Sequence, residues 1–207
     1  MGKRILLFEG LDDLRVVSTL CESRGLPDVD EVKQYEGVHR LLESFPIRLK
    51  ESDVEVLGVV LDADTSPAGR WEAIRKHLAE AGYPDVPERP TPTGTILPPP
   101  PASILPRTGI WIMPDNQTPG ILEDFLRFLV PDGSPLFSHV CASVAAIPEG
   151  ERRFSRVAEP KALIHTWLAW QEEPGKPLGL AVREGYFNVA SARVDALASW
   201  LNRLFFP

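Results

Sequence analysis

Residues 54–61 are the segment that most constrains the fold, because they are almost entirely apolar and stop abruptly at the sequence Asp62-Ala63-Asp64. A run of this length is too short for a membrane span and is typical of a strand that is buried on both faces. Residues 5–8 and 109–113 form two further runs of this kind, and an acidic residue follows each within two positions. Such strands belong to parallel sheets that are covered by helices.

Helical patterns separate these runs. Residues 14–21 and 38–49 carry apolar side chains at helical spacing, and Pro67 suits the first turn of a helix that we expect to run to about Gly82. A weaker strand is predicted at residues 32–35. Strands that alternate with helices favour an α/β fold, in which a mainly parallel sheet is flanked by helices and joined by right-handed crossovers.

We expect residues 1–207 to form a single domain, since a chain of 207 residues suffices for one sizeable core. Residues 84–106 hold nine of the 21 prolines, which excludes an ordinary helix. They are predicted to form an ordered excursion or short hairpin around the sheet, or else a mobile flap. Residues 134–207 are predicted to be a mostly helical C-terminal elaboration, with room for one short strand at residues 178–182.

Three of the predicted strands end in acidic residues, namely Glu9, the pair Asp62 and Asp64, and Asp115. The carboxyl ends of parallel strands meet at one edge of a sheet, where open α/β folds bind their ligands. In an extended backbone Asp62 and Asp64 point the same way, and Asp13 on the next helical turn can face the same pocket. Neighbouring carboxylates repel one another unless a cation compensates them, so the pattern predicts a site for Mg²⁺ or Mn²⁺.

Each of these acids also has a purely structural interpretation. Acids in the first turn of a helix are favoured by the helix dipole, which would account for Glu9 and Asp13. Asp62 and Asp64 are residue types that are common in turns and at helix N-caps. Asp115 is better suited to a turn than to a pair of metal ligands.

The basic residues of the C-terminal part also allow two interpretations. The residues concerned are Arg152, Arg153, Arg156 and Lys161. They form either a solvated patch with ion-pair partners or a guide for phosphate groups beside the acidic cluster. The formal net charge of the chain is -7, and a protein that grips long duplex DNA alone usually has a broad basic face. The composition therefore favours a small substrate, a partner that holds the nucleic acid, or basic residues that gather only after folding.

The residues after the first and third strands carry a resemblance to a known family. Phe8-Glu9-Gly10 and Leu61-Asp62-Ala63-Asp64 resemble the topoisomerase–primase (Toprim) domain, whose signature is a Glu-Gly and a later Asp-x-Asp, each after a strand. The chain is more closely similar to the Toprim domains of overcoming-lysogenization-defect (OLD) nucleases and to small stand-alone Toprim-like proteins of unknown function. The resemblance extends over residues 4–165 and implies a Toprim-like, Rossmann-like sheet.

The OLD-type resemblance also implies roles for particular residues. A second acid four residues after the glutamate is matched by Asp13, and a Gly-x-x-Glu is matched by the segment from Gly120 to Glu123. The residues implied to hold one or two Mg²⁺ ions are therefore Glu9, Asp13, Asp62, Asp64 and Glu123. Glu9 is also implied as a general base, and Lys161 is implied, by its order in the chain, to offset charge on the reacting phosphate.

The activity that the resemblance implies is Mg²⁺-dependent phosphoryl transfer, with a nuclease acting on DNA or RNA as the first expectation. OLD nucleases normally carry an ATPase, but this chain has no GxxxxGK[ST] motif, so an ATPase is an expected protein partner. The alternative is a non-catalytic Toprim-like module that regulates or binds another protein. A binder of small nucleotides is less favoured, because the chain lacks GxGxxG.

Cysteine usage and the N-terminal sequence bear on the compartment. Cys21 and Cys141 lack the spacing of a zinc site, and the apolar stretch near the N-terminus is too short for a signal peptide or a span. We therefore expect a cytoplasmic protein that makes no contact with a membrane.

Overall fold

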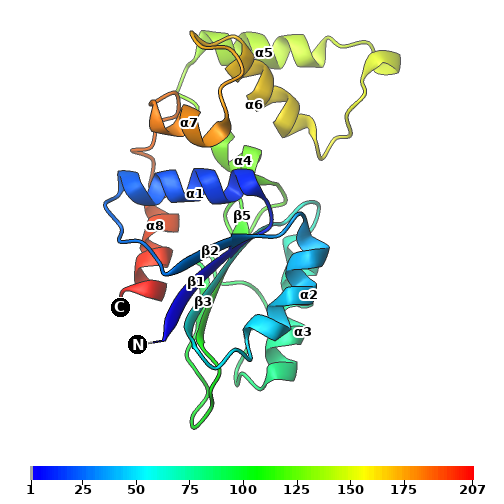
Figure 1. The fold of residues 1–207 in the computed structure, drawn as a ribbon. Helices are drawn as coiled ribbons and strands as arrows, with labels where there is room; N and C mark the ends of the chain where they lie inside the picture. The colour runs from blue at the N-terminus through cyan, green and yellow to red at the C-terminus, as the bar shows by residue number, and fades with distance from the viewer. Residues whose placement is uncertain (1) are drawn as a thin grey trace.

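The computed structural model describes residues 2–207 and contains a five-stranded sheet with the strand order β2-β1-β3-β5-β4 (Figure 1). All neighbouring strands run parallel except β4 and β5, which are antiparallel. The strands are β1 (Lys3–Phe8), β2 (Glu31–Gln34), β3 (Val54–Asp62), β4 (Thr95–Leu97) and β5 (Arg107–Met113). The prediction of an α/β fold with a mainly parallel sheet is confirmed.

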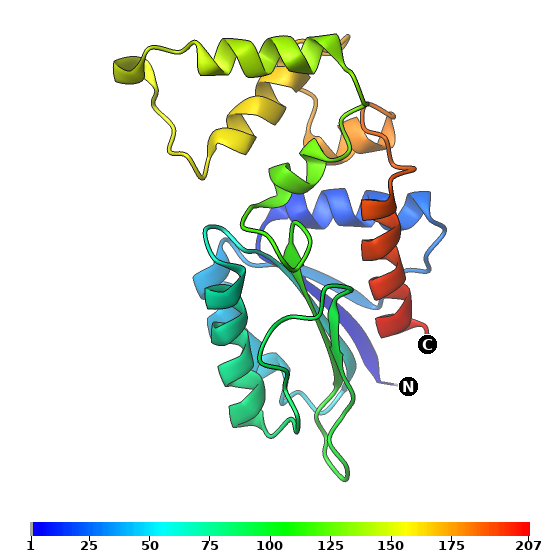
Figure 2. The ribbon, with the colours of Figure 1, turned by 180° about the vertical axis from the view of Figure 1, so that it is seen from behind.

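Helices cover both faces of this sheet (Figures 1 and 2). One face packs against α2 (Val38–Arg48) and α3 (Pro67–Ala81), and the other packs against α1 (Leu11–Ser23) and α8 (Ala192–Phe205). The remaining helices extend the core on the α1 side: α4 (Leu122–Arg127), α5 (Pro135–Ala145), α6 (Glu159–Ala169) and α7 (Leu178–Arg183). Within residues 2–207, no helix is both long enough and apolar enough to cross a membrane.

The alternation of side chains along β1 divides the core into two clusters. Leu6 and Phe8 belong to the cluster on the α1 side, whereas Ile5 and Leu7 belong to the cluster around α2 and α3. Successive strand residues point to opposite faces, so a strand between two helical layers has to be apolar at every position. This requirement explains why the strongest strands appear in the sequence as unbroken apolar runs.

Two glycines bring the last helix close to the sheet. Gly58 of β3 and Gly109 of β5 are register partners, and a Cβ atom at either position would meet the side chain of Leu204 in α8. Without Cβ atoms there, α8 seats Leu204 directly against the backbone of the two central strands. Trp200, one turn earlier, is fully buried and donates a hydrogen bond from its indole nitrogen to the carbonyl oxygen of Thr95.

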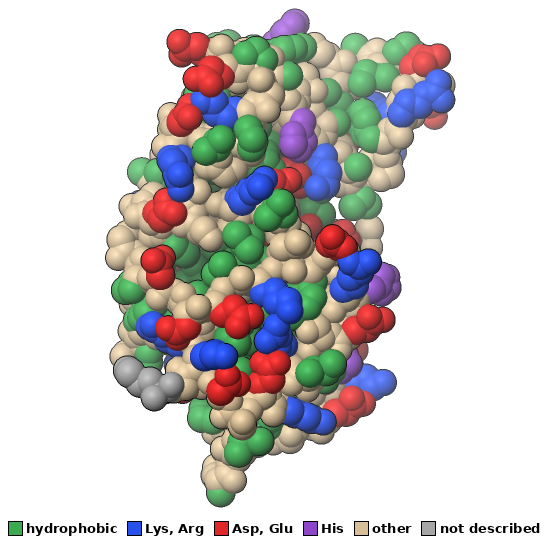
Figure 3. Space-filling view, viewed as in Figure 1, with side chains coloured by type: hydrophobic (Ala, Val, Ile, Leu, Met, Phe, Trp, Pro, Cys, Tyr) green, Lys and Arg blue, Asp and Glu red, His purple; other side chains and the backbone are tan. Residues whose placement is uncertain are grey.

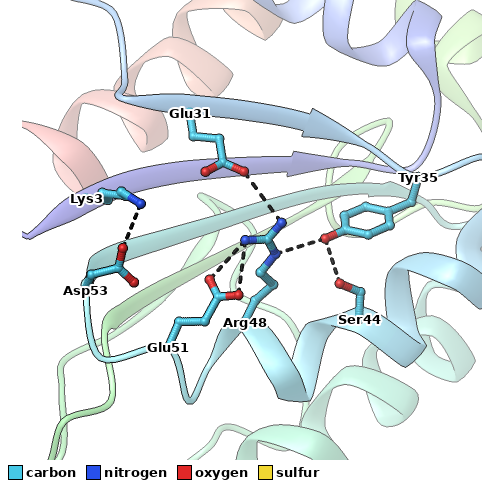
Figure 4. Close-up of polar contacts among 7 residues, drawn as sticks. All are labelled: Lys3, Glu31, Tyr35, Ser44, Arg48, Glu51 and Asp53. Carbon is cyan, nitrogen blue, oxygen red and sulfur yellow. Dashed lines mark hydrogen bonds and ion pairs between the residues drawn. The ribbon is translucent and has the colours of Figure 1, made fainter.

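A polar network fastens α2 to the edge of the sheet (Figure 4). The guanidinium group of Arg48 donates to the Tyr35 hydroxyl at 3.2 Å and to the Glu51 carboxylate at 3.0 Å, and it lies 3.5 Å from the Glu31 carboxylate. Ser44 donates to the same Tyr35 hydroxyl at 2.6 Å. The network therefore joins α2 both to the edge strand β2 and to the turn that leads into β3.

The proline-rich segment is an ordered hairpin. Its residues 95–97 form β4, which pairs with β5 in the register Thr95 to Ile110 and Leu97 to Thr108. Outside the strand, the segment is held by a hydrogen bond from the Trp71 indole to the carbonyl oxygen of Pro87. The pairing of β4 with β5 agrees with a short hairpin at residues 95–97.

Residues 178–182 form a helix, which corrects the suggestion of a short strand. In α7 the buried residues Leu178, Ala181 and Val182 follow helical spacing, and Gly179 packs against the backbone of Arg15 in α1. A short apolar run has no clear periodicity, so neither the helix nor the strand is favoured until its packing partner is known.

Candidate functional site

Four carboxylates from four separate segments converge at the C-terminal edge of the sheet. Glu9 follows β1 directly, and Asp62 is the last residue of the neighbouring strand β3. Asp13 lies in the first turn of α1, and Glu123 lies in the first turn of α4. Besides desolvation, the charges of Asp13, Glu9 and Glu123 all raise the pKa of Asp62.

Glu9 is held against the end of β3. Its carboxylate accepts a hydrogen bond from the backbone N–H of Asp62 at 3.2 Å, and its own backbone N–H donates to Val60. The sheet register brings the two residues together, because Phe8 is paired with Val60. Glu9 and Asp62 are therefore neighbours, as expected from the positions at which their strands end.

Gly10 makes room for the carboxylate of Asp13. A Cβ atom at Gly10 would lie 2.8 Å from one carboxylate oxygen of Asp13, although the backbone at this position is extended and unstrained. The glycine of the Glu9-Gly10 pair is thus explained by the space that the second acid occupies and not by a special backbone conformation.

Glu123 is buried beneath two residues of α6, Lys161 and His165. Its side chain is only 1% exposed, and one oxygen lies 3.0 Å from the Lys161 ammonium group and 3.8 Å from His165. Burial raises the pKa of Glu123, but His165 and Lys161 outweigh it and the net pKa is lowered. We assign most of this effect to Lys161, because 3.8 Å is longer than a hydrogen bond.

The other carboxylates are shifted in the opposite direction. Burial, and then the charge of Glu9, raise the pKa of Asp13 to about 7. Burial, and then the charge of Asp13, raise the pKa of Asp62 well above its usual range. Burial also raises the pKa of Glu9, although the hydrogen bond from Asp62 opposes the change. The edge is therefore short of positive charge even with Lys161 present.

Three buried oxygen atoms of this cluster have no hydrogen-bond partner: one each of Asp13, Asp62 and Glu123. Buried carboxylate oxygens without a donor are unfavourable, and a hard divalent cation is the ligand that suits them. In residues 2–207, however, no group of three or more His, Cys, Asp and Glu side chains is already arranged around a metal position. The donor set fits a divalent cation by its chemistry, and these side chains would complete their arrangement when the ion binds.

Asp64 differs from Asp62 in its surroundings. Its backbone has a φ of 50°, so the extended conformation expected for residues 62–64 does not continue through Asp64. Its carboxylate forms an ion pair with Arg70, which also donates to the carbonyl oxygen of Asp62 at 2.8 Å. The Asp64 side chain is 43% exposed, and it lies at the outer rim of the cluster.

Asp115 takes the structural role that its turn context suggested. Its carboxylate accepts hydrogen bonds from the backbone of Gln117 and Thr118 and forms an ion pair with Arg193 at 2.9 Å. Burial raises the pKa of Asp115, but these hydrogen bonds and Arg193 outweigh it, so the net pKa is lowered. With its carboxylate occupied in this way, Asp115 is not available to a ligand, which confirms the turn interpretation.

Sequence comparisons place the whole of this edge within one family. A family model described as a protein of unknown function (DUF3226) matches residues 3–206. The chain belongs to the DUF3226 family. No curated protein and no solved structure matches it. The family description names no activity, and the carboxylate edge is the feature of this DUF3226 chain that bears most directly on its function.

Two residues of the site were not singled out from the sequence of this DUF3226 chain. His165 lies four residues after Lys161, and this helical spacing could have placed both residues above the same carboxylate. Arg70 in α3 carries no such signal, since its contacts with Asp62 and Asp64 depend on the turn between β3 and α3.

We expect the substitution Asp13→Asn to stabilise the metal-free protein at pH 8 by on the order of 2 kcal/mol. In the folded state the pKa of Asp13 is about 7, whereas its ordinary value is 3.8. Between these two pKa values the folded state therefore binds more protons than the unfolded state. Wild-type stability therefore falls as the pH rises from about 4 to about 7. Asparagine removes this loss, and its benefit disappears near pH 4.

Urea unfolding in EDTA at both pH values measures this effect. The exposed neighbour Asp12 provides a matched control, because Asp12→Asn makes the same chemical change outside the buried cluster. A stabilisation by Asp13→Asn that is equal at pH 4 and pH 8 would show that charge repulsion at the site is not its cause.

Proposed function

We propose that this protein is a Mg²⁺- or Mn²⁺-dependent phosphoryl-transfer enzyme, with hydrolysis of DNA or RNA as its reaction. One observation carries the proposal: carboxylates from β1, β3, α1 and α4 meet at the ligand-binding edge of a parallel sheet, and three of their buried oxygens lack partners. The resemblance of Glu9-Gly10 and Asp62-Ala63-Asp64 to the Toprim signature supports the same reaction class.

The residues at the carboxylate edge would have different roles in the reaction. The residues that would hold one or two ions are Glu9, Asp13, Asp62, Asp64 and Glu123. A bound divalent ion supplies positive charge for the reacting phosphate and lowers the pKa of a water ligand. Glu9, whose pKa is raised, would accept a proton from an attacking water, and Lys161 would neutralise charge that develops on the phosphate.

The proposal includes the compartment. Cys21 and Cys141 are both free thiols in the structure, and a reducing cytoplasm is where such residues persist. A cytoplasmic phosphoryl-transfer enzyme of this kind would meet nucleic acids and ATPase partners in the same compartment.

The deciding experiment is incubation of the purified protein with labelled single-stranded DNA, duplex DNA and single-stranded RNA in Mg²⁺, Mn²⁺ or EDTA. We expect cleavage of at least one substrate with a divalent ion and none in EDTA. The same metals should raise the midpoint of thermal unfolding, because an ion that binds only the folded state stabilises it. Absence of cleavage together with an unchanged midpoint would overturn the proposal.

A second candidate is a non-catalytic module that regulates a partner protein. It is favoured by the contact of Lys161 with Glu123, which already satisfies part of the cluster without a metal. This candidate predicts no turnover with any nucleic acid. It also predicts a stable complex on affinity purification that survives EDTA.

A further inference from the structure

A cleft of about 620 Å³ opens beside the carboxylate edge, between that edge and the segment that leads into α6. Its lining includes Asp64, Thr65 and Gly120 together with the arginines Arg127, Arg152 and Arg156. A volume of this size lies within the range of sites that bind small ligands or parts of a polymer.

The arginines of this cleft retain unused hydrogen-bond donors. Arg156 has no carboxylate within 4.0 Å in the part of the chain that the structure describes, and the nearest carboxylate to Arg152, that of Glu159, is 3.9 Å away. The Nε atom of Arg152 is buried and has no hydrogen-bond partner. Arg127 makes only a 3.4 Å contact with Asp124. Guanidinium groups with free donors are suited to phosphate groups.

The cleft borders the proposed reaction site at Asp64, the one metal-ligand candidate among the residues that line it. Gly120 donates a backbone hydrogen bond to Asp64 at 2.8 Å, and this contact fixes the floor of the cleft next to the metal-ligand candidates. Asp64 itself is neutralised by Arg70. A chain of phosphates lying against Arg156 and Arg152 would reach the carboxylate edge at Asp64. Two other acids line the cleft: Asp124, which contacts Arg127 at 3.4 Å, and Glu159, whose carboxylate is 3.9 Å from Arg152.

The composition of the lining indicates which part of a nucleic acid would be bound. No aromatic residue lines the cleft, so there is no platform on which a base could stack. On the face shown in Figure 3, Lys and Arg side chains lie among Asp and Glu side chains, and there is no continuous basic surface. These features suit contacts with the backbone of one strand and do not suit a broad grip on a duplex.

We infer that this cleft, lined by Arg127, Arg152 and Arg156, binds the sugar–phosphate backbone of a single nucleic-acid strand beside the phosphate that reacts. The inference rests on the proposed function, since it names the substrate class of the same site. It further implies that recognition at the cleft is independent of base sequence.

Fluorescence anisotropy with labelled single-stranded DNA and RNA tests the inference. Ca²⁺ replaces Mg²⁺ to neutralise the carboxylates, because it takes the same oxygen ligands. We expect Arg156→Ala to weaken binding of either strand about tenfold. The slope of log affinity against log salt should become shallower by about 0.7 for each arginine removed. Arg183→Ala is the matched control, because Arg183 is an exposed arginine paired with Glu22 and lies outside the cleft.

The outcomes separate the cleft from the reaction. Equal binding by Arg156→Ala, Arg152→Ala and wild-type protein would overturn the inference, even if the wild-type protein cleaves nucleic acid. Binding that is lost in these variants but is never followed by cleavage would uphold the cleft and overturn the proposed function. Competition by inorganic phosphate as strong as by the oligonucleotide would show a phosphate site only, and it too would overturn the strand-binding inference.

Discussion

Asp62→Asn is expected to lower metal-dependent hydrolysis by about a thousandfold or more, because the substitution removes a charged ligand from the centre of the carboxylate cluster. The same substitution is expected to stabilise the metal-free fold. Asp62 is half-buried, its pKa is raised by desolvation and by Asp13, and one of its carboxylate oxygens is buried without a hydrogen-bond partner. Replacing the carboxylate by a neutral amide of the same shape removes that repulsion at neutral pH.

We therefore expect activity and stability to change in opposite directions at Asp62. Such a trade-off is common where an active site is destabilised for the sake of function. Hydrolysis assays in Mn²⁺ and thermal unfolding in EDTA measure the two quantities. Addition of Mn²⁺ should raise the unfolding midpoint of the wild-type protein and leave that of Asp62→Asn nearly unchanged.

Asp115→Asn is a matched control at the same edge of the sheet. The Asp115 carboxylate is occupied by Thr118 and Arg193, so its substitution should lower stability and leave the metal-dependent activity close to that of the wild-type protein. Activity that survives in Asp62→Asn, or that is lost equally in Asp115→Asn, would show that Asp62 is not at the reacting centre.

Lys161→Met is expected to destabilise the protein by about 2 kcal/mol at pH 8, which corresponds to a fall of roughly 4–8 °C in the unfolding midpoint. Glu123 is almost completely buried, and removal of Lys161 leaves its charge with only the distant His165. We place the effect below the usual value for a broken buried pair, because the Lys161 side chain is 55% exposed and solvent weakens the interaction.

The pH dependence of this effect has a definite sign. The pKa of Glu123 is lowered in the folded protein, so its ion pair contributes stability above the ordinary carboxyl pKa and loses it as the pH falls through the folded value. The destabilisation by Lys161→Met should therefore be largest at neutral pH and should shrink in acid, where Glu123 is protonated in both states.

A double-mutant cycle separates the ion pair from other effects of the lysine. Glu123→Gln introduced into Lys161→Met should recover most of the lost stability, because no buried charge then remains unpaired. Lys3→Met is a matched control, since Lys3 pairs with Asp53 at 2.7 Å on the surface (Figure 4) and both side chains are more than half exposed. Its loss should leave stability nearly unchanged, because solvent screens an exposed ion pair. A similar loss in both variants would contradict the special role of burial at Glu123.

The central fold was readable from the sequence because its strands are buried on both faces. The covered parts of β1, β3 and β5 are apolar on both faces, and the parallel arrangement then places Glu9 and Asp62 at the same edge. Asp13 was placed near the pocket by its position one helical turn after Glu9, whereas Glu123 was predicted only through the family resemblance. Their position beside Asp62 depends on how α1 and α4 pack.

The parts that escaped prediction depend on contacts between distant segments. The different surroundings of Asp64 follow from a left-handed residue and from Arg70, neither of which leaves a pattern in the sequence. The helix α7 was ambiguous because its five apolar residues are too few for a period, and its packing against α1 decided the outcome. The free donors of Arg152 and Arg156 likewise depend on which acids the fold brings near them.

The position of α8 has a consequence for biosynthesis. This helix covers the central strands through Leu204, and the chain ends meet where the guanidinium of Arg4 lies over the ring of Phe206 at 5.1 Å. A growing polypeptide on the ribosome exposes one side of the sheet until residue 205 has emerged. We therefore expect the acidic edge to acquire its final arrangement only after translation of α8.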